Sequence, residues 1–124
     1  MLKGKALERK EILNQELDRY LALLIKHENP EKIILFGSMA TGDIHEWSDI
    51  DLVIIKETDL PFLRRLDEIY QLLRPRVGIE IFVYTPEEFK SMSEERIFIR
   101  DEILGKGVII HERGSEELVD LRSK

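Results

Sequence analysis

Two aspartates stand at the start of the most apolar stretch of this sequence, and their position constrains the fold more than any other feature. Asp49 and Asp51 are separated by one residue, and the β-branched run from Ile50 to Ile55 predicts a buried central strand. Successive side chains of a strand point to opposite faces, so both carboxylates share one face while Ile50 and Leu52 enter the core. The fold must therefore hold two acids together at the beginning of a buried strand.

Two like charges this close are costly unless a cation neutralises them. Oxygen ligands without His or Cys suit a hard ion such as Mg²⁺. The alternative is that Asp49 ends a loop and Asp51 is a solvated edge residue. For an isolated Asp-x-Asp that alternative is the better one. The choice between a metal site and two solvated acids therefore depends on the neighbouring segments.

Those neighbouring segments favour a metal site. Lys32 to Phe36 predicts a short strand that runs directly into Gly37-Ser38, where a missing Cβ and free backbone amides can hold a phosphate. The strand predicted at Gly78 to Tyr84 carries Glu80 as an acid between core residues, and a charge in that setting needs a partner or a metal. Three acids on two strands beside a phosphate-binding turn predict a two-metal site.

Helices are predicted on both sides of these strands. Apolar residues at steps of three and four predict amphipathic helices over about 5–27 and from Pro61 to Leu73, with Asp59 as a candidate cap. Thr85-Pro86 predicts the start of a further helix that continues through Arg100 and Ile103 and is closed by Gly105-Lys106-Gly107.

A last short strand is predicted at Val108 to His111, followed by a polar tail at 113–124. The 124 residues therefore predict one domain, 1–124, with its core at about 30–112. Its class is α/β (α+β), with a mixed sheet of about four strands flanked by helices.

Composition limits the classes of binding partner and the cellular compartment that are expected for this chain. The net charge of −6 disfavours nucleic acid, which is bound through Lys and Arg. The absence of cysteine excludes disulfides and thiolate zinc sites and fits a cytoplasmic protein. The longest apolar runs are far shorter than the roughly 18 residues that span a bilayer, so no membrane association is expected. Exposed apolar residues on the first helix could serve a homo-oligomer.

The motifs resemble those of a known superfamily. The segment from Phe36 to Gly42, followed by the segment from Trp47 to Ile54, is similar to the Gly-Ser and Asp-x-Asp signature of polymerase-β nucleotidyltransferases. Ile79-Glu80-Ile81 resembles the third motif of that superfamily, and the similarity is greatest to its minimal, MNT-type branch. The resemblance implies a polymerase-β-like nucleotidyltransferase fold.

The resemblance also implies a role for each site residue. Gly37 and Ser38 would contact the nucleotide phosphates, and Asp49 and Asp51 would bind two Mg²⁺ ions. Glu80 would complete the second metal site and act as the catalytic base. The implied enzyme is a Mg-dependent nucleotidyltransferase that moves a nucleoside monophosphate, with AMP from ATP as the first expectation, to a hydroxyl of a protein or small molecule.

MNT-type proteins are commonly paired with a small helical HEPN protein, often a toxin RNase that some of them modify with AMP. The resemblance therefore implies an antitoxin role toward a HEPN-type partner. The alternative is a catalytically weak or inactive binding module that neutralises its partner by occlusion. Many members have Arg where this chain has Met39 and Thr41, so the charge that neutralises phosphate is missing or comes from Arg74, Arg76 or a partner.

Other conspicuous residues have ordinary interpretations. The three histidines, His27, His45 and His111, have no ligand spacing, which predicts structural or solvated roles. Trp47 either stacks on a base or anchors its loop. Arg64-Arg65 is predicted to lie on the solvated face of its helix.

Overall fold

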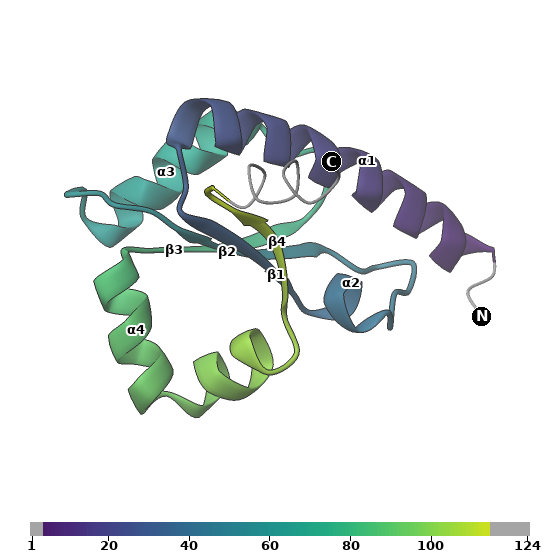
Figure 1. Cartoon of the computed structure of the whole chain (residues 1–124). Helices are drawn as coiled ribbons and strands as arrows, with labels where there is room; N and C mark the ends of the chain where they lie inside the picture. The colour runs from purple at the N-terminus through teal and green to yellow at the C-terminus, as the bar shows by residue number, and fades with distance from the viewer. Residues whose placement is uncertain (1–3, 115–124) are drawn as a thin grey trace, which may run out of the picture.

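The computed structural model describes residues 4–114 (Figure 1). Its elements follow in chain order as α1 (Lys5–Glu28), β1 (Lys32–Phe36), α2 (Ser38–Thr41), β2 (Ile50–Ile55), α3 (Phe62–Leu73), β3 (Ile79–Tyr84), α4 (Pro86–Glu95), the π-helix η1 (Ile99–Leu104) and β4 (Val108–Glu112). The polar tail predicted at 113–124 lies outside the described residues after position 114.

The four strands form one mixed sheet in the order β3-β2-β1-β4. β1 is antiparallel to β2 and β4, whereas β2 and β3 are parallel. A parallel pair cannot be joined by a tight hairpin, and α3 makes the crossover between β2 and β3. The predicted α+β architecture, a mixed four-stranded sheet with helices, is confirmed.

Alternating side chains divide the core into two layers. On one face of the sheet, Leu52 and Ile54 pack in a cluster with residues of α1 and α3 such as Tyr20 and Ile69. On the other face, Val53 and Ile55 belong to a second cluster with residues of α4 and η1, namely Phe89, Ile99 and Ile103. Figure 1 shows α1 and α3 on one side of the sheet and α4 on the other. Asp51 has the same parity as Val53, so its side chain emerges on the side of α4 and η1.

The single helix predicted to run from Pro86 to Gly105 is broken into α4 and η1. α4 ends at Glu95, and Arg96 has extended backbone with φ −114° and ψ 122°. The break allows Ile99 to be buried against the sheet while Ile97 is 65% exposed. Tertiary burial of η1 therefore overrides the helical preference of the sequence before it.

The start of α4 is formed as predicted, whereas the cap proposed for α3 is wrong. Thr85 and Glu88 make a reciprocal capping box: the Glu88 amide donates to Thr85 Oγ1 at 3.1 Å, and the Thr85 amide donates to Glu88 Oε1 at 2.8 Å. At α3 the N-cap is Pro61 with no side-chain cap, so Asp59 does not fill this role.

Arg65 does not lie on a solvated face, which corrects the prediction for the Arg64-Arg65 pair. Only 8% of Arg65 is exposed, and its Nε donates to the Leu60 carbonyl at 2.8 Å. Nη1 donates to the Val83 carbonyl, and both terminal nitrogens bond the Glu88 carboxylate at 2.6 and 3.1 Å. Arg65 thus ties α3 to β3 and to the start of α4, while Arg64 is exposed.

No helix within the described part of the chain has the length and apolar character to cross a bilayer.

Candidate active site

Asp51 lies at the centre of the candidate site. In the register of the sheet it pairs with Phe36, the last residue of β1, and with Glu80 on β3. Side chains of directly paired residues on adjacent strands leave the sheet on the same face. The structure therefore places two of the three predicted carboxylates, Asp51 and Glu80, side by side.

Gly37 makes room for the carboxylate of Asp51. A Cβ atom at Gly37 would overlap Oδ2 of Asp51, and the φ of 72° is one that other residues rarely adopt. Gly37 leads directly into the four-residue helix α2 (Ser38–Thr41), and its carbonyl accepts from the Ala40 and Thr41 amides at 3.0 and 3.1 Å. The amide of Ser38 precedes these bonds and begins the helix beside the Asp51 carboxylate.

Asp49 immediately precedes β2 and lies against the start of β3. The amide of Ile50 donates to the Gly78 carbonyl at 3.1 Å, and a Cβ atom on Gly78 would overlap the Asp49 carboxylate. Gly78 thus leaves space for Asp49 as Gly37 does for Asp51. The sequence analysis did not single out Gly78, because its role depends on the pairing of β3 with β2.

The three carboxylates interact electrostatically. Burial, together with the negative charges of Glu80 and Asp49, raises the pKa of Asp51 from 3.8 to about 6. Glu80 is exposed, and the Asp49 side chain is 53% exposed. The folded protein therefore disfavours the charged form of the Asp51 carboxyl group.

The donor chemistry of this cluster fits Mg²⁺ that shares its coordination with a nucleotide. Within residues 4–114, no three His, Cys, Asp or Glu side chains lie close enough together to hold a metal ion by themselves. Mg²⁺ is usually bound by one or two carboxylates together with substrate phosphates and water, rather than by an all-protein cage. Asp49 and Asp51, each lodged against a glycine, supply hard oxygen donors of the required kind.

Arg9, which the sequence analysis did not identify, provides positive charge at the site. Its Nε donates to the Ser48 carbonyl at 2.8 Å, and its Nη2 lies 3.5 Å from Oδ1 of Asp49. Arg9 is on α1, 40 positions before Asp49, so no local sequence signal links the two residues.

Arg74 and Arg76, the two predicted alternative sources of phosphate-binding charge, both have backbone hydrogen bonds to α1. The amide of Arg76 donates to Glu16 Oε2 at 3.2 Å, and its guanidinium lies 3.9 Å from Glu16 Oε1. The carbonyl of Arg74 accepts from Arg19 Nη2 at 3.2 Å. In the described part of the chain, ion pairs with Asp49, Asp51 or Glu80 are made by Arg9 alone.

The loop before β2 is held by its own hydrogen bonds. Ser48 is buried, its Oγ accepts from the His45 amide at 2.9 Å, and the Trp47 amide donates to His45 Nδ1 at 3.2 Å. His45 therefore has a structural role in the loop, as predicted. The indole of Trp47 is 77% exposed, so packing does not anchor it.

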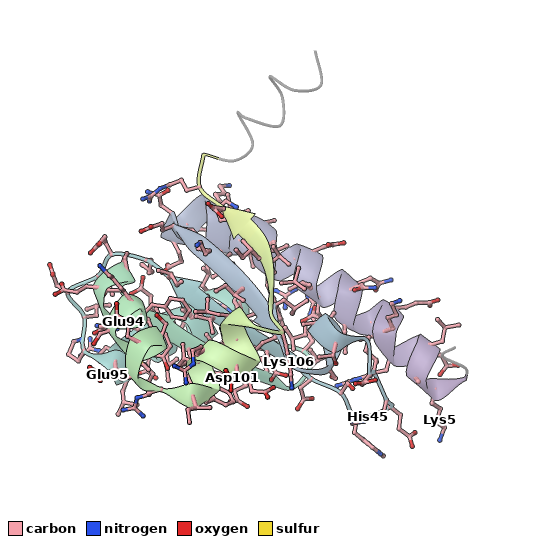
Figure 2. The ribbon with its side chains drawn as sticks, turned by 60° about the horizontal axis from the view of Figure 1, so that its bottom comes forward. Lys5, His45, Glu94, Glu95, Asp101 and Lys106 are labelled. Carbon is pink, nitrogen blue, oxygen red and sulfur yellow. The ribbon has the colours of Figure 1, made fainter. Side chains whose placement is uncertain are left out.

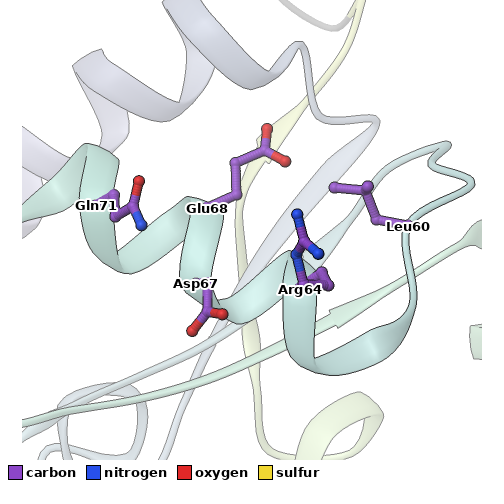
Figure 3. A pocket seen from close by; sticks show the side chains of 5 residues that line it. All are labelled: Leu60, Arg64, Asp67, Glu68 and Gln71. Atoms are coloured by element: carbon purple, nitrogen blue, oxygen red, sulfur yellow. The ribbon is translucent and has the colours of Figure 1, made fainter.

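A separate hollow of about 630 Å³ lies along α3, lined by Leu60, Arg64, Asp67, Glu68 and Gln71 (Figure 3). Its walls are mostly exposed charged side chains of both signs, and it contains none of the predicted site residues. The carboxylates at the start of β2 and the hollow on α3 are thus distinct features.

Two solved structures are similar to this chain in fold. One is a candidate nucleotidyltransferase from Sulfolobus solfataricus, with a TM-score of 0.64 and 17% identity over 90% of this chain and 91% of that one. Another is a toxin-antitoxin structure with AMP-PNP, with a TM-score of 0.52 and 18% identity over 82% of this chain and 77% of that one. At these identities the likeness concerns the fold.

A comparison with curated proteins finds no match. The family model described as polymerase beta, nucleotidyltransferase, matches residues 19–116, which include Gly37, both aspartates and Glu80. The chain therefore belongs to the polymerase beta nucleotidyltransferase family.

Proposed function

We propose that this protein is a Mg-dependent nucleotidyltransferase that moves AMP from ATP to a hydroxyl of a protein or small molecule. The observation that carries the proposal is the place of Asp51, beside Glu80 and against Gly37 at the turn into α2. Burial and two neighbouring acids raise the pKa of Asp51, so its charged form beside the glycine turn is costly, and a bound cation would relieve that cost.

In this proposal Asp49 and Asp51 bind two Mg²⁺ ions, and Glu80 joins the second site. Gly37 and Ser38 contact the phosphates through the backbone at the start of α2. When bound, Mg²⁺ would neutralise charge on the triphosphate and make the acceptor hydroxyl easier to deprotonate. Glu80 takes the proton of that hydroxyl, the acceptor oxygen bonds to the α-phosphorus, and the bond from this phosphorus to the departing pyrophosphate breaks.

The proposed acceptor is a protein partner, a small helical HEPN-type toxin that the transfer of AMP would neutralise. The structural likeness to a toxin-antitoxin protein with AMP-PNP supports this choice over a small-molecule acceptor. The partner would complete a site that this small domain leaves open.

The test is to incubate the chain with a HEPN-type toxin, Mg²⁺ and each of the four NTPs, and to measure the intact mass of the toxin. We expect a mass increase of one or more AMP units with ATP and none with EDTA. D49N and D51N should abolish the increase, whereas D67N, a change to an exposed acid on α3, should leave it intact. A toxin that keeps its mass under every condition would contradict AMP transfer to that partner.

Neutralisation by occlusion is the second candidate function. Apolar side chains are exposed along η1, the segment before it and the edge strand β4, and a partner could cover them: Ile97, Phe98, Leu104, Val108 and Ile109. In this case D49N and D51N would still neutralise the toxin. Retained neutralisation would therefore favour occlusion, and lost neutralisation would favour catalysis.

A further inference from the structure

Arg9 reaches the carboxylate pair from a distant part of the chain. It lies in the second turn of α1 and precedes the residues that the family model matches, which begin at residue 19. Its side chain is 23% exposed and is therefore partly withdrawn from water. A charged side chain that loses part of its hydration is costly unless its charge and its donors are used.

The contacts of Arg9 orient its guanidinium. The hydrogen bond from Nε to the Ser48 carbonyl, at 2.8 Å, is to a residue that is itself 3% exposed and hydrogen-bonded to His45. The guanidinium is planar and rigid, so a fixed Nε also fixes the directions of Nη1 and Nη2. Nη2 consequently faces Oδ1 of Asp49 at 3.5 Å.

Apart from Nε, the nitrogens of the Arg9 guanidinium donate no hydrogen bond to residues 4–114. Nη1 has no acceptor among residues 4–114, and the contact of Nη2 with Asp49 is an ion pair longer than a good hydrogen bond. Arginine binds phosphate oxygens through two parallel N–H groups. A polyphosphate whose metal is held by Asp49 would bring anionic oxygens to the same carboxylate that Arg9 faces.

We propose that Arg9 is a nucleotide-positioning residue: it pairs with Asp49 in the ligand-free protein and donates to the polyphosphate once a metal ion takes that carboxylate. The inference rests on the proposed function and extends it to a residue outside the matched family region. Met39 and Thr41 are uncharged, so they cannot neutralise phosphate. Arg9 thereby supplies this positive charge from α1.

This role has a signature that a merely structural role lacks. Arg9 repels a cation approaching Asp49, so its removal should leave the affinity for a metal ion alone unchanged or higher. The same removal should weaken nucleotide binding, because charge-assisted hydrogen bonds to phosphate are lost. A residue that only held the loop would weaken both.

The chain offers a matched control on the same helix and loop. Lys5 lies one turn before Arg9, and its Nζ is 3.6 Å from Oε2 of Glu46, with the two side chains 79% and 42% exposed. Figure 2 shows Lys5 and His45 at the same end of the molecule. K5A therefore removes a contact between α1 and this loop without touching Ser48 or Asp49.

The experiment compares wild type, R9A, R9K and K5A. Binding of Mn²⁺ alone is measured by electron paramagnetic resonance. Binding of an ATP analogue with a methylene bridge between its α- and β-phosphates, in excess Mg²⁺, is measured by calorimetry. We expect R9A to weaken analogue binding about tenfold, as for the loss of a charge-assisted hydrogen bond, and to bind Mn²⁺ at least as tightly as wild type. K5A should match wild type in both measurements.

R9K keeps the charge but not the planar fork, so it should bind Mn²⁺ like wild type and the analogue with intermediate affinity. Melting curves of the ligand-free variants verify that each is folded. If R9A does not fold, R9K is compared with wild type in its place. Unchanged analogue binding in R9A and R9K, or a parallel loss of Mn²⁺ and analogue binding, would overturn the role of Arg9. Failure of wild type itself to bind the analogue would instead overturn the proposed function.

Discussion

Asp51 and Glu80 are direct neighbours on the parallel strands β2 and β3, and this pairing places two acids on one face of the sheet. The Asp51 carboxylate also lies against Gly37, which follows the end of the antiparallel neighbour β1. The site therefore depends on three strands meeting around one residue. Four predictions follow from its surroundings and from the buried ion pairs that hold the domain together.

Asp51 should destabilise the fold at neutral pH. Its pKa is about 6 in the folded protein against 3.8 as the ordinary value, so the folded state binds the proton more tightly and stability falls as pH rises from about 4 through 6. Because the group is half-buried and solvent weakens the effect, we expect D51N to raise the free energy of unfolding at pH 7.5 by on the order of 1 kcal/mol.

Urea unfolding at pH 7.5 and pH 4 checks this prediction, and the gain should vanish at the lower pH. D67N, on the exposed surface of α3, should show no comparable difference. An equal gain at both pH values would mean that charge repulsion at Asp51 is not the cause.

A side chain at Gly37 should disturb Asp51, and Gly42 provides the control. Both glycines have positive φ, but Gly37, with φ 72° and ψ −156°, is in a region that essentially only glycine adopts, whereas Gly42, with φ 89° and ψ 0°, is left-handed helical, so the backbone cost is larger for G37A than for G42A. Only a Cβ at Gly37 would overlap Asp51, whereas a Cβ at Gly42 would meet no atom within 4 Å. G37A should therefore lose at least about 1 kcal/mol more than G42A in chemical unfolding.

The steric part of the excess should disappear in a D51A background, because the overlapping carboxylate is then absent, so the excess should become smaller. An excess that is undiminished in the D51A background would place the whole conflict in the backbone rather than at the carboxylate.

Arg65 should be far more important for stability than its neighbour Arg64. R65A removes the paired contact with Glu88 and the donors to the carbonyls of Leu60 and Val83, so we expect a loss of about 2–4 kcal/mol in the free energy of unfolding. R64A changes an exposed side chain and should stay within about 0.5 kcal/mol of wild type. Similar losses in the two variants, measured by urea unfolding, would refute the assignment.

Glu16 should stabilise the fold above pH 4.5 and lose this effect in acid. Hydrogen bonds from Arg19 are the main cause that lowers the pKa of Glu16 from 4.5 to about 2. A depressed folded pKa adds stability that is complete above the unfolded value and is lost as pH falls toward 2. E16Q should therefore cost about 2 kcal/mol at pH 7 and little at pH 2, in thermal or urea unfolding.

E11Q, at an exposed position of the same helix, is the matched control and should cost little at either pH. A cost for E16Q that does not change with pH would point to lost packing instead of lost charge.

The sequence by itself determined the strands and the start of α4, and it displayed the candidate acids. Lys32–Phe36 and Ile50–Ile55 form the strands that their β-branched runs predict, because the pattern is local and repeats every second residue. The Thr85-Pro86 start of α4 follows for the same reason, since a capping box needs only residues three positions apart. These features depend on chain neighbours, which the sequence displays directly.

Tertiary structure alone decided which distant side chains meet. The link between Arg9 and Asp49, the burial of Arg65 and the use of Gly78 as space for a carboxylate all join segments far apart in the chain. The break after Glu95 belongs to the same class, because burial of Ile99 against the sheet outweighs local helix preference. Such contacts exist only after strand register and helix packing are set, so no local periodicity can encode them.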